Sequence, residues 1–197
     1  MRIIGITGGI GTGKSTILSI LKKEPNSFIV EADALAHQLM EQGQAAYKKI
    51  VDVFGKDILD SNGNINRNVL GKIVFEDVNL LKQLNEIVHP AVKKYILSDI
   101  QKKSEQGFQN YIIEAALLIE DGYKEVCDEI WYVYVEKEER IRRLIKGRGG
   151  NRDKWEAVIQ NQSSDDYYRQ YSDFVIDNGE NLTKTEDVVK ELLFKSG

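Results

Sequence analysis

Residues 1–21 of the chain read MRIIGITGGIGTGKSTILSIL. The segment Arg2–Ile6 is apolar and β-branched, which is typical of a buried parallel strand. The segment Thr16–Leu21 carries its apolar residues at helical spacing. Between them, GGIGTGKS at 8–15 satisfies the spacing G-x-x-x-x-G-K-[ST]. A strand, a glycine loop and a helix in this order predict a phosphate-binding loop in an α/β fold.

The chemistry of this loop predicts a bound nucleoside triphosphate. Glycines allow successive N–H groups to turn toward a phosphate chain, and the helix N-terminus adds partial positive charge. Lys14 is expected to reach the β- and γ-phosphates, and the Ser15 hydroxyl to hold Mg²⁺. A glycine-rich turn with a chance lysine is the weaker alternative. The expected nucleotide-binding residues are Gly8, Gly9, Ile10, Gly11, Thr12, Gly13, Lys14, Ser15 and Thr16.

Composition narrows the class of protein. The 197 residues are 42% hydrophobic and 29% charged, with a net charge of −4, so a nucleic-acid partner is not expected. One cysteine excludes an internal disulfide and fits the reducing cytoplasm. Neither a secretion signal nor an apolar run long enough for a membrane span is found. The absence of an N-K-x-D stretch argues against a GTP switch, so a small-molecule kinase that uses ATP is favoured.

Two carboxylates follow predicted strands, where ligand groups collect in a doubly wound sheet. Asp33 comes just after Ser27–Glu31 and is expected to act as a base or to hold a Mg²⁺-bound water; a helix N-cap is the alternative. His37, one turn later on the same helix face, is a candidate phosphate contact or an ordinary surface residue. Glu114 lies in the predicted strand Tyr111–Leu118 and is expected either to order Mg²⁺ through water or to pair with a basic side chain.

Residues 34–105 are expected to be mostly helical, with helices near 45–54, 68–75 and 80–88. Because proline disfavours helical geometry in the residue before it, one helix is predicted to end near Val88 and another to start at Pro90. This block is long for a crossover between strands. It is therefore either one wall of an acceptor pocket or a purely structural insertion.

The stretch 137–154, KEERIRRLIKGRGGNRDK, is the strongly basic part of the chain. An arginine-bearing helix followed by glycines suits a lid that closes over ATP, with Arg143 as the first candidate to neutralise charge on the transferred phosphoryl group and Arg140 and Arg148 as alternates. A solvated charged face is the alternative. Further strands are predicted at 130–135 and 174–176, and a last helix at 185–194.

Together these motifs resemble the dephospho-CoA kinase family. The resemblance rests on the segments GITGGIGTGKST, EADALAH, NGNINRNVLGKIVF, LNEIVHP, EAALLIEDG, RIRRL and YSDFVIDNG, in the family's order. It implies a doubly wound parallel sheet of the P-loop type, with its core at about 1–33, 108–136 and 170–197. It also implies a helical substrate-binding insertion at about 34–107 and a helical lid at about 137–169.

The resemblance further implies a function. The enzyme is expected to transfer a phosphoryl group from ATP, with Mg²⁺ as cofactor, to the ribose 3′-hydroxyl of dephospho-CoA, with Asp33 as the base. His89, before Pro90, matches a family position near the acceptor, and a monomer is favoured. Three positions depart from the family pattern. Glu114 and Ala116 replace an aspartate and a proline, and Val158 replaces an arginine, so Arg148 or Arg152 is expected to contact adenine or phosphate instead. A nucleoside or nucleotide kinase and a non-enzymatic ATP-binding module are the rival readings.

Overall fold

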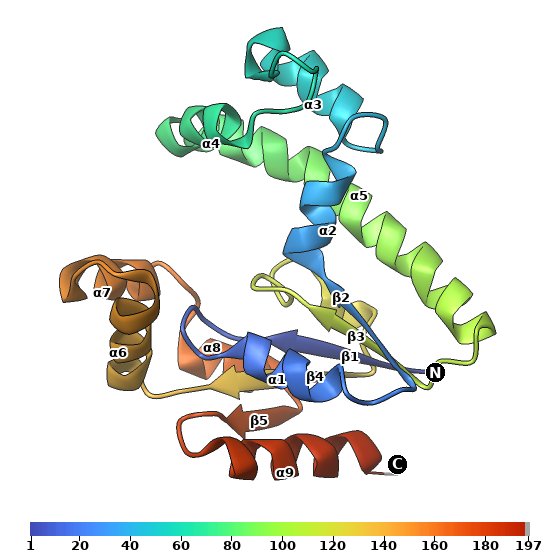
Figure 1. The fold of residues 1–197 in the computed structure, drawn as a ribbon, viewed down its shortest axis with the longest axis vertical. Helices are drawn as coiled ribbons and strands as arrows, with labels where there is room; N and C mark the ends of the chain where they lie inside the picture. The colour runs from blue at the N-terminus through green and yellow to red at the C-terminus, as the bar shows by residue number, and fades with distance from the viewer. Residues whose placement is uncertain (196–197) are drawn as a thin grey trace. The chain divides into compact units, whose positions relative to one another are not determined.

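The computed structural model describes residues 1–195 and contains a five-stranded sheet with the order β2-β3-β1-β4-β5 (Figure 1). Strand β1 pairs in parallel with β3 and β4, and β4 pairs in parallel with β5. The predicted parallel α/β fold is confirmed. The strands are β1 (Arg2–Thr7), β2 (Ser27–Glu31), β3 (Asn110–Glu114), β4 (Glu129–Tyr134) and β5 (Phe174–Asp177).

The central position of β1 explains its apolar sequence. Ile4 lies opposite Ile112 of β3 and Glu129 of β4, and both Ile4 and Ile6 are 0% exposed. A strand with a neighbour on each edge and helices on its faces has no solvent-facing side, so alternation gives way to a continuous apolar run. The core around it includes Ile17, Leu21, Trp131, Val133, Ile176, Val189 and Leu193.

Helices connect the strands. They are α1 (Lys14–Leu21), α2 (Ala32–Leu39), α3 (Tyr47–Phe54), α4 (Arg67–Glu76), α5 (Val78–Glu105), α6 (Lys137–Arg148), α7 (Arg152–Gln160), α8 (Asp165–Tyr171) and α9 (Leu182–Phe194), with short 3₁₀ turns η1 (Lys56–Ile58) and η2 (Tyr123–Glu125). Among residues 1–195, no helix combines the length and apolarity that a bilayer crossing requires.

The chain forms two compact units. Met1–Val30 and Lys103–Gly197 make up one, here called the sheet unit, and Glu31–Lys102 makes up the other, here called the helical unit. The helical unit has buried side chains of its own. They are Leu35, Leu39, Ala46, Ile50, Ile58, Leu70, Val88, Val92 and Ile96.

The predicted helix break at Pro90 is wrong, because α5 runs without interruption from Val78 to Glu105 with Pro90 inside it. Proline removes one helical hydrogen bond, to the carbonyl of Glu86 four residues earlier. Both Pro90 and Glu86 are exposed, so water can satisfy that carbonyl. The buried stripe formed by Val88, Val92 and Ile96 continues past the proline and keeps the helix intact.

The predicted strand Tyr111–Leu118 is too long, since β3 ends at Glu114. The partner strand β1 ends at Thr7, where the glycine loop begins. After the N–H of Ala115 donates to the carbonyl of Ile6 at 3.2 Å, the chain therefore turns away from the sheet. Glu114 consequently stands at the carboxyl end of β3, beside the end of β1.

Candidate active site

The loop between β1 and α1 has the left-handed backbone that its glycines predict. Gly11 and Gly13 have φ values of 82° and 83°. Gly13 is the N-cap of α1, and a Cβ there would lie 2.4 Å from Nδ2 of Asn178, so neither its backbone nor its surroundings admit a side chain. No side chain of the described residues caps α1. The N–H groups and the partial positive charge of a helix N-terminus favour an anion in general.

Lys14 folds back over this loop. Its Nζ donates to the carbonyl of Gly8 at 2.8 Å and lies 3.6 Å from Oε1 of Glu114. Glu114 is 9% exposed. Of the two roles left open for this carboxylate, the structure shows pairing with a basic side chain. Lys14, Gly8 and Glu114 therefore form one charged group at the carboxyl ends of β1 and β3.

Ser15 follows Lys14 in the first turn of α1, and its side chain is exposed. The N–H of Thr16 donates to the carbonyl of Gly13 at 2.9 Å, which closes that turn. In the described part of the chain, no group of three His, Cys, Asp or Glu side chains is arranged to hold a metal ion.

The arginines of α6 differ in their contacts and in their distance from the phosphate loop. Arg143 donates from Nε to Oε1 of Glu139 and from Nη2 to the carbonyl of Asn178, both at 2.8 Å. A Cβ on Gly13 would lie 3.7 Å from Nη1 of Arg143, so this guanidinium lies beside the phosphate loop. Hydrogen bonds from Arg142 and Arg143 lower the pKa of Glu139 to about 2.

Arg140, Arg148 and Arg152 lie elsewhere. Arg140 is 4% exposed and contacts the loop backbone, so it is not placed as a mobile phosphate contact. Arg148 is exposed at the end of α6, and Arg152 donates to Glu138 and Glu156 at 2.5 and 2.9 Å. These surface ion pairs contribute little to stability.

Two side chains with no role predicted from the sequence hold the loop. Asn178 donates from Nδ2 to the carbonyl of Thr12 at 2.8 Å and accepts from Oγ1 of Thr185 at 3.2 Å. Gln162 accepts from the N–H of Ile10 at 2.8 Å. The turn sequence Asn178-Gly179 and the late glutamine were visible in the sequence, but neither pattern indicates which backbone group it contacts.

The remaining predicted residues belong to the helical unit. Asp33 and His37 are both exposed and lie one turn apart on α2. Glu31 is the N-cap of α2 and makes no side-chain cap, while Asp33 is the second helical residue, so the N-cap alternative for Asp33 is not observed. The two side chains therefore share one exposed face of α2, opposite buried Leu35.

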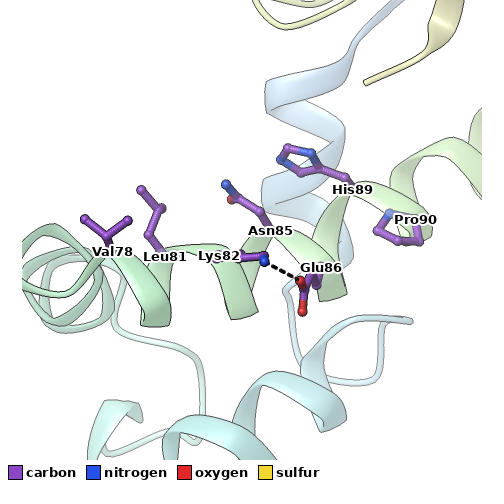
Figure 2. A pocket seen from close by; sticks show the side chains of 7 residues that line it. All are labelled: Val78, Leu81, Lys82, Asn85, Glu86, His89 and Pro90. Carbon is purple, nitrogen blue, oxygen red and sulfur yellow. Dashed lines mark ion pairs between the residues drawn. The ribbon is translucent and has the colours of Figure 1, made fainter. Parts of the chain in front are cut away.

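His89 is half-buried and lines a hollow of about 450 Å³ on α5 (Figure 2). Asn85 and Leu81 project from the same helix toward this hollow, and Lys82 pairs with Glu86 at 3.9 Å beside it. Both polar and apolar groups are thus offered along one helix face. The helical unit also carries a second hollow of about 450 Å³, lined in part by Lys49, Lys94 and Tyr95.

Comparison with known proteins decides the family. The family model for dephospho-CoA kinase matches residues 2–184. The chain belongs to the dephospho-CoA kinase family. It is 39% identical over 195 residues to the dephospho-CoA kinase of Carboxydothermus hydrogenoformans, covering 99% of this chain and 94% of that protein. It is 37% identical over 192 residues to that of Corynebacterium diphtheriae, covering 98% and 96%.

Solved structures agree on the fold. TT1252 from Thermus thermophilus superposes with a TM-score of 0.80 at 28% identity, covering 100% of this chain and 98% of that one. Dephospho-CoA kinase from Campylobacter jejuni gives 0.73 at 24% identity, covering 98% of each chain. Shikimate kinase from Acinetobacter baumannii gives 0.57 at 11% identity, covering 98% and 91%. This chain is therefore a kinase with the P-loop α/β fold, and as such it uses ATP.

Proposed function

We propose that this chain transfers the γ-phosphoryl group of ATP to the ribose 3′-hydroxyl of dephospho-CoA, which is the last step of coenzyme A synthesis. The observation that carries the proposal is the family match over residues 2–184. That span includes the phosphate loop, the whole helical unit and the α6–α8 segment, so the resemblance is not limited to the nucleotide-binding motif.

The donor site is assigned to the loop of residues 8–16. Lys14 Nζ is held by the Gly8 carbonyl and the Glu114 carboxylate. Both partners are acceptors, so phosphate oxygens are chemically equivalent replacements for them. Lys14 then supplies positive charge that follows the β- and γ-phosphates into the transition state.

The residues present fit Mg²⁺. Ser15 offers an exposed hydroxyl in the first turn of α1, and Glu114 offers a carboxylate at the end of β3. Mg²⁺ commonly keeps several waters and binds through one or two protein groups plus substrate phosphates, so a dedicated protein cage is not required. When bound, the ion would neutralise negative charge on the phosphates.

The acceptor is assigned to residues of about 34–107. The hollow beside His89 and the hollow lined by Lys49, Lys94 and Tyr95 offer cationic and aromatic side chains, which suit the phosphates and the base of a nucleotide-like acceptor. Asp33 is assigned as the base, since its exposed carboxylate is available to orient the hydroxyl and take its proton. His37, on the same face, is assigned to the acceptor phosphate.

The segment of about 137–169 is assigned as the lid. Arg143 is its proposed catalytic arginine, because its guanidinium lies beside the N-cap glycine of α1. The exposed Arg148 is assigned to the nucleotide. The single Cys127 fits a reducing compartment, so we propose that the protein acts in the cytoplasm, and we propose that it does so as a monomer.

The test is phosphoryl transfer from ATP to dephospho-CoA, with the position of the new phosphate established by NMR. Asp33→Asn is expected to bind ATP normally and to lower turnover by about 100-fold or more. Asp52→Asn, an exposed aspartate of α3, is the matched control and should be silent. Normal turnover in Asp33→Asn would remove Asp33 from the role of base. A wild-type enzyme that phosphorylates nucleosides in preference to dephospho-CoA would overturn the assigned acceptor.

A further inference from the structure

Both polar backbone atoms of Ile10, at the crown of the phosphate loop, are bonded to side chains from distant parts of the chain. The N–H of Ile10 donates to Oε1 of Gln162 at 2.8 Å. The carbonyl of Ile10 accepts from Nε of Arg140 at 2.9 Å. Nη2 of Arg140 also donates to Oε1 of Gln162 at 3.2 Å, which closes a ring of three hydrogen bonds.

The guanidinium of Arg140 also pairs with a carboxylate on the side away from the loop. Arg140 is 4% exposed, and its Nη1 lies 3.6 Å from Oδ1 of Asp165. That carboxylate accepts from the hydroxyl of Tyr132, in β4, at 2.6 Å. Burial and this bond raise the pKa of Tyr132, so the phenol remains a donor. The arginine is therefore held between the sheet and the loop and has a single orientation.

Packing between α6 and the loop matches this arrangement. A Cβ on Gly9 would lie 2.1 Å from Nη2 of Arg140, and a Cβ on Gly11 would lie 3.0 Å from Cγ of Leu144. The two glycines thus leave the space that Arg140 and Leu144 occupy. Because they have no side chain, the two glycines allow α6 to pack closely against the loop, and they also give the loop its backbone freedom.

We propose that Arg140 and Gln162 are positioning residues that fix the backbone on both sides of the Ile10 Cα, so that the phosphate loop is already shaped before nucleotide binds. A loop with glycines at 8, 9, 11 and 13 has many accessible conformations, and ordering it on binding would weaken affinity. Bonds to the N–H and to the carbonyl of one central residue hold the two peptide groups that flank it and remove much of that freedom in advance. The proposal rests on the proposed function only in taking this loop as the ATP site.

The two positions also relate the loop to the lid. Arg140 lies in the first turns of α6, and Gln162 follows the end of α7, so the pair stands at both ends of the α6–α7 hairpin. The α6 and α7 helices stand next to each other in Figure 1. The two bonds to Ile10 and the bond between Arg140 and Gln162 therefore join the loop to both stems of this hairpin, while its glycine turn at 149–150 lies outside the ring.

The test measures nucleotide affinity by calorimetry on the full chain without acceptor. Gln162→Met keeps length and removes the shared acceptor, and Arg140→Lys keeps the charge and loses the paired geometry. Each is expected to weaken ATP and ADP binding by about 10-fold, with AMP affinity within about twofold, because AMP lacks the β- and γ-phosphates. The double variant should lose less than the product of the two single losses, because both act through Oε1 of Gln162.

The matched controls are Gln160→Met on α7 and Arg142→Lys on α6. Both residues are exposed, so these substitutions should leave the affinities for ATP, ADP and AMP unchanged. Unfolding midpoints of all variants establish that the fold is retained. ATP and ADP affinities within about twofold of wild type in both test variants would overturn the proposal, as would an equal loss for AMP. Failure of the proposed function has a different signature, since it concerns which acceptor is phosphorylated and leaves these affinities unaffected.

Discussion

Asn178 supports the phosphate loop from the end of β5, and its removal should destabilise the sheet unit. The side chain is 6% exposed. Its Nδ2 donates to the carbonyl of Thr12 at 2.8 Å, and its Oδ1 accepts from Oγ1 of Thr185 at 3.2 Å. Asn178→Ala removes both bonds and introduces no charge, so the two partners are the groups that determine the cost.

The size of the effect follows from those partners. A buried carbonyl left without a donor costs about 1–3 kcal/mol, which applies to Thr12, itself 0% exposed. The hydroxyl of Thr185 keeps a longer contact of 3.4 Å to the carbonyl of Asn181, so its loss is smaller, about 1 kcal/mol. The expected destabilisation is therefore about 3 kcal/mol. For a chain of this size it corresponds to an unfolding midpoint lower by about 6–12 °C.

Tryptophan fluorescence during urea unfolding provides the assay. Trp131 in β4 and Trp155 in α7 are both buried in the sheet unit, so their emission reports on the unit that Asn178 stabilises. Asn161→Ala, an exposed asparagine after α7, is the control and should change stability by less than about 0.5 kcal/mol. A loss below about 1 kcal/mol for Asn178→Ala would refute the reasoning that its two bonds hold buried groups of the loop.

Three further predictions concern the loop, the lid and the thiol. Lys14→Ala should lower turnover by about 100-fold or more while leaving the fold intact, and near-normal turnover would contradict the assignment of the loop. Arg143→Ala should lower kcat more than it weakens ATP binding. Arg142→Ala, on the exposed side of α6, should change neither quantity. The same kcat and ATP affinity in both variants would mean that the arginines of α6 form a solvated face. Burial raises the pKa of Cys127 to about 12, so the thiol is protonated at pH 8. A thiol reagent should therefore react rapidly only after the protein is unfolded in urea. Rapid labelling of the native protein would contradict this prediction, because it would show that the Cys127 thiol is accessible.

Local sequence was sufficient where the chemistry is local. The phosphate loop is contiguous with the strand before it and the helix after it, so residues 2–21 predict their own structure, and β1 and α1 are found there. The apolar runs at 130–135 and 174–176 likewise indicate β4 and β5, because a strand buried on both faces has little room for polar residues. Order of motifs along the chain also sufficed to identify the dephospho-CoA kinase family.

Two features depend on residues that are far apart in the sequence or on tertiary packing, and only the tertiary structure reveals them. The continuity of α5 through Pro90 follows from an exposed proline beside an uninterrupted buried stripe, and a residue pattern alone does not reveal that balance. The pairing of Glu114 with Lys14 depends on β3 lying next to β1, although the chain visits β2 and the helical unit between them.

The supports of the loop are the clearest case. The bonds from Asn178 to Thr12 and from Arg140 and Gln162 to Ile10 span 166, 130 and 152 residues of sequence. Periodicity and propensity act over a few turns of chain, so they can place Arg140 on a helix and Asn178 after a strand but cannot identify their distant partners. Only the strand order and the packing of α6 against the loop determine which backbone atom each side chain contacts.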